Sequence, residues 1–179
     1  MSAEDLEDLD GRIAEAWGGD AGANGSHVNV VLARRGSPTA AVLLGTLTTP
    51  TPGHTPILVV VGEDQPSYEP VWPPTIMINK ATAVEERHQT ITWGAAQLGI
   101  AQGVLDAVAD GLLEPTDELL VFVAVWVDPA ASDETAVRKA NREATRKAIA
   151  VAINGRDPAA ARALVERRDS VSSPFYGGG

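Results

Sequence analysis

Histidines and a strand-terminal lysine are the side chains in this sequence best suited to acid–base or carbonyl chemistry. His27 and Asn29 lie two residues apart in the stretch SHVNVVLARRGSP. Side chains two apart on a strand project from one face, so the Asn29 amide can orient the imidazole ring. An imidazole has an ordinary pKa of about 6.5 and exchanges protons near neutral pH. The alternative for His27 is a structural histidine at a strand end, satisfied by the backbone.

The other polar candidates carry weaker signals. His54 lies between prolines in a loop, where histidines are usually solvated, and His88 stands among charged residues at the start of a helix. Lys80 ends a predicted strand, where an ammonium can hold an anion or polarise a carbonyl. Gln97 lies at the margin of a helical apolar stripe and needs partners, either a bound heterocycle or a loop backbone. No histidine has a second ligand at metal-binding spacing, so no zinc site is expected.

The elements that must position these groups are mostly short. Val28, Val30 and Leu32 alternate with His27 and Asn29, which predicts a half-buried strand over residues 27–33. Residues 57–62 are wholly apolar and predict a buried central strand. The remaining predicted strands cover residues 12–18, 75–80 and 119–127, and the remaining predicted helices cover residues 38–47, 84–113, 133–154 and 158–168. Adjacent strands without an intervening helix favour an α+β fold, with a mixed β-sheet layered with helices on one face.

The longest predicted helix, residues 84–113, contains two patterns. Ile91, Leu98 and Leu105 recur every seven residues and predict an apolar stripe along the helix. Three glycines in the same segment each cost about 1 kcal/mol of helix stability relative to alanine. Glycines in a helix interior usually mark the close approach of another backbone or a ligand. These glycines are Gly94, Gly99 and Gly103.

Composition narrows the function classes. The chain has 179 residues, which predicts one domain, and a formal net charge of −10 argues against nucleic-acid or membrane-surface binding. Without cysteine there is no disulfide and no thiol chemistry. The acidic first residues do not form a signal peptide, and no apolar run reaches the roughly 18 residues of a membrane span. We therefore expect a soluble, cytoplasmic protein. GxSxG, Walker and GxGxxG motifs are absent, so hydrolase and nucleotide-binding functions lack support.

Several motifs in order resemble one family. His27 is followed by RGSP at residues 35–38, TTPTPGHTP at 48–56, NKAT at 79–82, WGAAQ at 93–97 and a tail similar to DSVxSPF from residue 169. Together they resemble the formaldehyde-activating enzyme family, over roughly residues 13–176. This chain would be a divergent member, with an acidic, frayed or weakly helical N-terminal extension at 1–12 and a glycine tail at 177–179.

The resemblance implies a fold related to the second domain of ribosomal protein S5, a homopentamer, and a pterin bound between subunits. It implies condensation of formaldehyde with tetrahydromethanopterin, or a related reduced pterin, to the methylene-pterin and water. This activity is that of a carbon–nitrogen hydro-lyase, and it would serve one-carbon metabolism and formaldehyde detoxification. His27 would be the acid/base, and no metal is implied. The residues at the positions that the resemblance assigns to the pterin pocket are Asn29, Leu58, Lys80, Thr82 and Gln97.

Two departures from the family bear on function. The family pattern after the histidine is His-x-Asp, whereas this chain has Asn29, and an amide cannot compensate the charge of an imidazolium. The loop at residues 63–74 is about four residues longer than expected and adds Tyr68 and Trp72 near the approach to the pocket. The alternative function is therefore a catalytically inactive or repurposed homologue that binds a pterin-like ligand or senses aldehyde. A purely structural pentamer has less support, because polar pocket residues are costly to keep where nothing binds.

Overall fold

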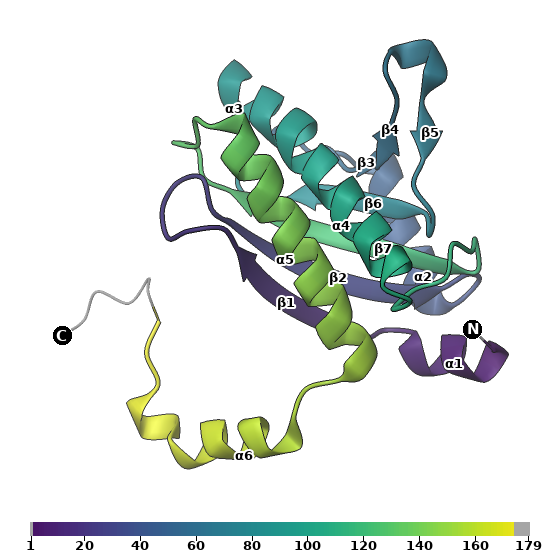
Figure 1. Cartoon of the computed structure of the whole chain (residues 1–179), viewed down its shortest axis with the longest axis vertical. Coiled ribbons are helices and arrows are strands. Elements are labelled where there is room, and N and C mark those ends of the chain that lie inside the picture. Colours follow the sequence, from purple (N-terminus) through teal and green to yellow (C-terminus); the bar gives the residue numbers. More distant parts are fainter. Residues whose placement is uncertain (1, 174–179) are drawn as a thin grey trace.

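The computed structural model describes residues 2–173 and builds them around one five-stranded sheet (Figure 1). The strand order is β1-β2-β7-β6-β3, and every neighbouring pair is antiparallel except β6 and β7, which run parallel. The strands are β1 (Ile13–Gly18), β2 (Ser26–Arg34), β7 (Leu119–Val127), β6 (Thr75–Asn79) and β3 (Ile57–Leu58). A mixed sheet covered by helices confirms the predicted α+β class, while the likeness to the ribosomal protein domain stays a prediction.

The helices and the short elements complete the chain. A separate hairpin pairs β4 (Val60–Val61) with β5 (Glu69–Pro70) and stands out from the body in Figure 1. The α-helices are α1 (Ala3–Leu9), α2 (Pro38–Gly45), α3 (Glu86–Thr90), α4 (Gln97–Ala109), α5 (Glu134–Asn154) and α6 (Pro158–Glu166). Single turns or π-helical segments are η1 (Thr46–Thr48), η2 (Gln65–Ser67), η3 (Ile91–Ala96) and η4 (Arg168–Ser170). Among residues 2–173, none of these helices combines the length and hydropathy that crossing a bilayer requires.

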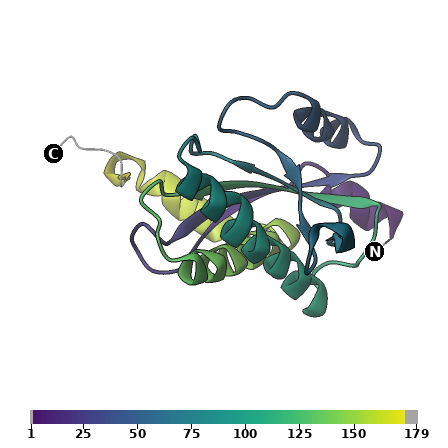
Figure 2. The same ribbon diagram turned by 90° about the horizontal axis from the view of Figure 1, so that it is seen from above.

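The two faces of the sheet are covered unequally. Helices α4 and α5 lie side by side over one face and bury the main core against it, including Val28, Val30 and Leu32 as predicted (Figure 1). Helix α2 lies on the opposite side (Figure 2), where Ala40 packs in a small cluster with Ala33 of β2. The outer face is therefore covered at one end and open at the other, where β2 begins.

Several predicted elements differ from the structure. Residues 57–62 contain two strands of two residues each and no central strand. β3 lies at the edge of the sheet, where Leu58 is exposed, and β4 belongs to the separate hairpin. Residues 3–9 form a helix closed by a capping box between Ser2 and Asp5, and this helix buries Leu6 and Leu9. The acidic segment is thus docked on the core. Predicted residues 174–176 and the glycine tail at 177–179 lie outside the described residues.

The glycines of α4, and not its leucines, face α5. A Cβ added to Gly99 would lie 2.3 Å from the Arg138 carbonyl oxygen, and one added to Gly103 would lie 2.7 Å from the Arg142 carbonyl oxygen. These two glycines confirm the predicted close approach of a backbone. Leu98 and Leu105 remain 40% and 45% exposed, whereas Ile91 is buried, so the predicted seven-residue stripe is buried at Ile91 but not at these two leucines. Helices this close leave no space for large side chains between them.

We expect Gly99→Ala to lower the free energy of unfolding by about 1–3 kcal/mol, because the added methyl group must push two helix backbones apart. Gly94→Ala is the matched control, since nothing lies within 4 Å of the position of its Cβ. That variant should be neutral or stabilised by up to about 1 kcal/mol. Urea unfolding followed by circular dichroism measures both, and equal stability of the two variants would contradict the packing argument.

Candidate active site

Cross-strand pairing brings His27 and Lys80 together at the open end of the outer face. His27 lies opposite Trp17 of β1 and opposite Trp126 of β7. Lys80 directly follows β6, and its backbone N–H donates to the Val125 carbonyl at 2.7 Å, which extends the β6–β7 ladder by one residue. Residues across from one another in a sheet share a face. His27 and Lys80 are therefore near neighbours, although 53 positions separate them in sequence.

Three hydrogen bonds join four side chains into one cluster. Lys80 Nζ donates to His27 Nδ1 at 2.7 Å and to Asn29 Oδ1 at 2.6 Å. His27 Nε2 lies 2.5 Å from Glu15 Oε2. Because an ionised carboxylate only accepts, the imidazole donates to Glu15 through Nε2 and accepts from Lys80 through Nδ1. The ring is thus held in one tautomer and one orientation by a carboxylate on one side and a cation on the other.

Glu15 is a functional candidate that the sequence interpretation missed. It lies opposite Asn29 in the β1–β2 register, on the outer face of β1. A signal was present in IAEAWG, where Ala14, Ala16 and Gly18 alternate with larger residues and Gly18 and Ala14 are buried. Alternation places Glu15 outward, but its pairing with His27 depends on the register of two strands joined by a seven-residue loop. The predicted contact between Asn29 and the ring is replaced by one between Asn29 and Lys80.

Lys80 has an altered acidity within this cluster. Although the residue is exposed overall, desolvation around its amine lowers the pKa of Lys80 to about 8, and the charge of Glu15 acts in the opposite direction. Loss of water disfavours the charged form of a base, whereas a nearby carboxylate favours it. Lys80 consequently interconverts between ammonium and amine close to physiological pH.

The cluster opens into a pocket of about 780 Å³. Its apolar walls are Trp17 and Trp126, whose ring centroids are 6.3 Å apart with planes tilted by 36°. The remaining lining residues are Glu15, Gly22, Ala23, His27, Lys80 and Asp128. Apolar walls around a few convergent polar groups are typical of small-molecule sites. No group of three or more potential metal ligands is found in the part of the chain that the structure describes.

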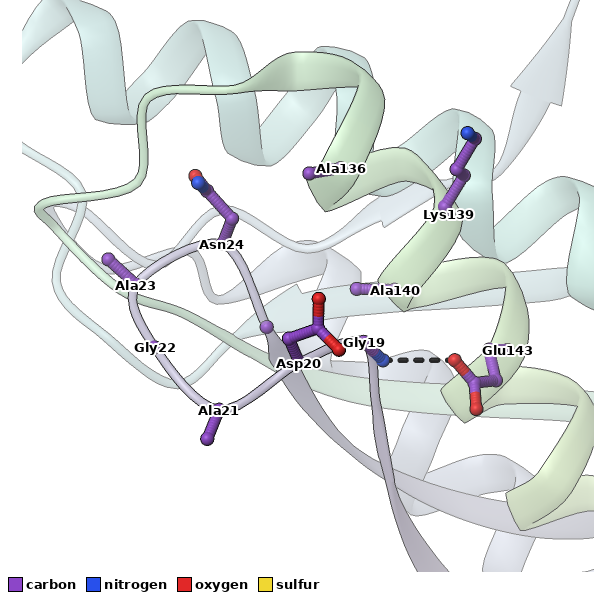
Figure 3. Close-up of a pocket in the computed structure, with 11 residues that line it drawn as sticks. Gly19, Asp20, Ala21, Gly22, Ala23, Asn24, Ala136, Lys139, Ala140 and Glu143 are labelled. Atoms are coloured by element: carbon purple, nitrogen blue, oxygen red, sulfur yellow. Dashed lines mark hydrogen bonds between the residues drawn. The ribbon is translucent and has the colours of Figure 1, made fainter.

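A loop between β1 and β2 forms one wall of this pocket and is held from behind by α5. The Gly19 N–H donates to Glu143 at 3.0 Å, as the dashed line in Figure 3 shows. Ser26, at the end of the loop, donates to the buried Asn141 at 2.9 Å. A smaller hollow of about 340 Å³ lies between loop and helix, and one of its two carboxylates, Glu143, is already engaged by Gly19 and Lys147. The contacts around this hollow hold the loop that forms one wall of the His27 pocket.

Thr82 and His54 lie beside the cluster and support the strand end. His54 Nδ1 lies 2.9 Å from the Asn79 carbonyl oxygen, and His54 Nε2 lies 2.9 Å from Thr82 Oγ1. The PGHTP loop is therefore fastened to the residues flanking Lys80, and His54 is half-buried where a solvated ring was expected. The prediction for His88 is also wrong, because His88 is only 4% exposed and its Nε2 bonds to the Val127 carbonyl. The charged neighbours of His88 suggested a solvated ring, but the start of α3 packs on the sheet and buries it.

Two predicted pocket residues are not brought to His27 within one chain. Leu58 lies opposite Ile76 on β3, the sheet edge farthest from β1. Gln97 is on α4, on the other side of the sheet, and its Nε2 donates to the Val60 carbonyl at 2.6 Å. A loop backbone thus supplies the partner that Gln97 required. Tyr68 and Trp72 belong to the projecting hairpin region and are exposed, but neither lines the His27 pocket.

An α+β sheet with an imidazole, an amine and a carboxylate in one pocket defines a class of protein equipped for proton transfer on a small ligand. The sequence profile of the formaldehyde-activating enzyme family matches residues 13–176. The chain is 36% identical over 152 residues to a 5,6,7,8-tetrahydromethanopterin hydro-lyase of Methanosarcina barkeri, covering 84% of this chain and 82% of the relative. The chain belongs to the formaldehyde-activating enzyme family.

Other relatives are larger proteins. Bifunctional enzymes Fae/Hps of Methanothrix thermoacetophila and Archaeoglobus fulgidus are each 30% identical, over 148 and 140 residues. These matches cover 82% and 77% of this chain but only 36% and 34% of the relatives. The chain therefore spans about a third of those bifunctional proteins, and the similarity concerns that part alone.

The contact between Glu15 and the cluster predicts a measurable change at Lys80. Glu15→Gln should lower the pKa of Lys80 below about 8, because the carboxylate that favours its ammonium form is removed. The pH dependence of acetylation by limiting acetic anhydride, read by peptide mass spectrometry, gives this pKa, with Lys139 and Lys147 as references in the same digest. Asp117→Asn is the control, since Asp117 pairs with Arg35 away from the site. An unchanged Lys80 profile in Glu15→Gln would contradict the electrostatic coupling.

Proposed function

We propose that this protein condenses formaldehyde with a reduced pterin of the tetrahydromethanopterin type, giving the methylene-pterin and water. The observation that carries the proposal is the Glu15–His27–Lys80 cluster, which joins the predicted histidine and lysine inside an apolar-walled pocket of a chain that belongs to this family. The hydro-lyase relative supports the same substrate pair. We also predict a cytoplasmic location, which the family's metabolic substrates favour.

His27 has the geometry of a proton donor and acceptor. Condensation releases the formaldehyde oxygen as water, so a proton must reach a hydroxyl group that leaves and another must depart from an attacking nitrogen. The imidazole lies between an acceptor, Glu15, and a donor, Lys80, so Nδ1 can take a proton from the lysine while Nε2–H keeps its hydrogen bond to the carboxylate. Holding an aldehyde and an amine together in the pocket adds the advantage of proximity.

We further propose that the pterin site is completed by a second copy of the chain, in a homopentamer. Leu58 and Gln97 lie on elements that do not border the His27 pocket of their own chain. Exposed apolar side chains on α4, Leu98 and Leu105, suit an interface between copies. A heterologous contact repeated around a ring would place Leu58 and Gln97 of one copy against His27 and Lys80 of the next.

The second candidate is a homologue without condensing activity, which binds a pterin-like ligand or senses aldehyde. Asn29 favours it, because a neutral amide stands where the family has a carboxylate. An aspartate at this position would also raise the pKa of Lys80, since Asn29 Oδ1 is 2.6 Å from Nζ. If the wild-type protein is inactive and Asn29→Asp gains condensing activity, the chain is an enzyme that has lost its activity through this substitution. If the wild-type protein is inactive and Asn29→Asp gains none, the result supports a binding protein.

Stopped-flow absorbance of formaldehyde with tetrahydromethanopterin, and separately with tetrahydrofolate, should show acceleration over the spontaneous rate with one carrier. His27→Ala should reduce that acceleration by about 100-fold or more, the usual effect of removing a general acid–base group. Circular dichroism and light scattering control for fold and oligomer size. Unfolding or dissociation of His27→Ala would indicate a structural histidine, and absence of acceleration with both carriers would overturn the condensing function.

A shared site predicts complementation between inactive variants. His27→Ala and Gln97→Ala should each be impaired alone, whereas co-expression should restore activity to roughly a quarter of the interfaces by random assembly around a ring. Steady-state rates of the co-purified mixture measure this. Mixing Lys80→Ala with His27→Ala is the control, because both lesions fall in one chain's pocket and no interface receives an intact pair. Failure of His27→Ala with Gln97→Ala to exceed this control would contradict the shared site.

A further inference from the structure

The chain contains three lysines, and one of them differs from the others in its surroundings. Lys80 lines the pocket with Nζ 2.7 Å from an imidazole nitrogen. Lys139 and Lys147 are on α5, where Lys147 pairs with Glu143 at 2.5 Å and Lys139 borders the smaller hollow (Figure 3). Lysine amines add to aldehydes in their neutral form, and an enzyme can activate a lysine by placing a base beside it.

We propose that Lys80 is a covalent catalyst, whose amine captures formaldehyde as an N-methylene iminium ion and passes the methylene carbon to the acceptor amine. In capture, the nitrogen lone pair forms a C–N bond while the carbonyl pair becomes a hydroxyl group. Protonation of that hydroxyl then breaks the C–O bond and releases water. In transfer, one acceptor nitrogen bonds to the methylene carbon and passes its proton to the Lys80 nitrogen, and the Lys80 C–N bond breaks as the acceptor nitrogen forms a C=N bond, which regenerates the amine. The second acceptor nitrogen then bonds to the same carbon and loses its proton, which gives the methylene product. Only this transfer rests on the proposed function, because capture needs formaldehyde alone.

The neighbours of Lys80 supply both proton transfers. His27 Nδ1 accepts the hydrogen bond from Nζ and is placed to take the ammonium proton, which frees the lone pair. Glu15, 2.5 Å from Nε2, stabilises the imidazolium so formed. The same imidazolium then lies beside the new carbinolamine and can protonate its hydroxyl. Asn29 Oδ1 holds the amine in place at 2.6 Å without adding a negative charge that would keep it protonated.

The surroundings of Lys80 also favour its nucleophilic form. With a pKa of about 8, roughly one molecule in ten carries the amine at pH 7, against fewer than about one in a thousand for an ordinary lysine. Trp17 and Trp126 form apolar walls beside it, which offer no hydrogen bonds along those walls to stabilise the ammonium form. Desolvated lysines with this acidity are the type that form Schiff bases with carbonyl compounds.

Reductive trapping tests capture directly. The intact protein is mixed with an equal amount of formaldehyde and cyanoborohydride at pH 7, digested, and mapped by mass spectrometry for added CH₂ groups. Lys80 should be methylated roughly tenfold faster than Lys139 or Lys147, as expected for an activated amine. His27→Ala should slow labelling of Lys80 and leave the other two lysines unchanged. Equal rates at all three lysines would overturn the proposal.

Two further measurements test transfer. Protein loaded with isotopically labelled formaldehyde is chased with tetrahydromethanopterin and excess unlabelled formaldehyde, and the methylene product should carry the label. Lys80→Arg keeps the cation but is no nucleophile, so it should lose the acceleration; retention of the wild-type rate would overturn covalent catalysis. Acceleration by a wild-type protein that shows no Lys80 labelling would refute this inference and leave the proposed function standing. Labelling of Lys80 without acceleration would refute the proposed function and leave capture established.

Discussion

The site depends on the register of β2 against its two neighbours. β2 pairs with β7 along its whole length, from Ser26 opposite Val127 to Arg34 opposite Leu119, and β1 pairs on its other side. Because side chains alternate across a strand, a slip of one residue would turn His27 into the core and Val28 outward. The buried hydrogen bond between Ser26 and Asn141 fastens the first residue of β2 to α5, at the point where the register matters to the site. Packing on one face thereby sets chemistry on the other.

The carboxylate of Glu15 contacts or acts on both titratable groups of the cluster, His27 and Lys80. Glu15 contacts His27 directly and acts on Lys80 through space, so one carboxylate stabilises a protonated imidazole and opposes the loss of the lysine proton. The amide of Asn29 keeps a hydrogen bond to Lys80 without a second charge. The pKa of Lys80 is therefore set mainly by desolvation, which outweighs the opposing charge of Glu15. The His-x-Asn sequence is therefore compatible with proton transfer at His27, since the carboxylate comes from another strand.

The packing of α4 on α5 explains why Gln97, a predicted pocket residue, lies away from the His27 pocket. Gly99 and Gly103 allow the two helix backbones to touch, which leaves Leu98 and Leu105 facing solvent. Gln97, at the start of α4, donates a hydrogen bond to the Val60 carbonyl at the base of the projecting hairpin. The apolar surface of α4 and the edge strand with Leu58 are thus displayed away from the His27 pocket. This surface is the part of the chain that would complete the pocket of a second copy in the proposed ring.

The amino-acid pattern was enough to predict the alternating faces of residues 27–33, the close backbone approach at Gly99 and Gly103, the α+β class and the choice of His27 and Lys80 as site candidates. These follow from local periodicity and motif spacing, which a chain carries without folding. The contact of Glu15 with His27, the hydrogen bond between Asn29 and Lys80, the burial of His88 and the edge position of β3 became known only from the folded chain. Each depends on strand register or on which helix covers which face, and these are fixed by contacts between segments distant in sequence. The acidity of Lys80 belongs to the same group, because desolvation exists only once the pocket has formed.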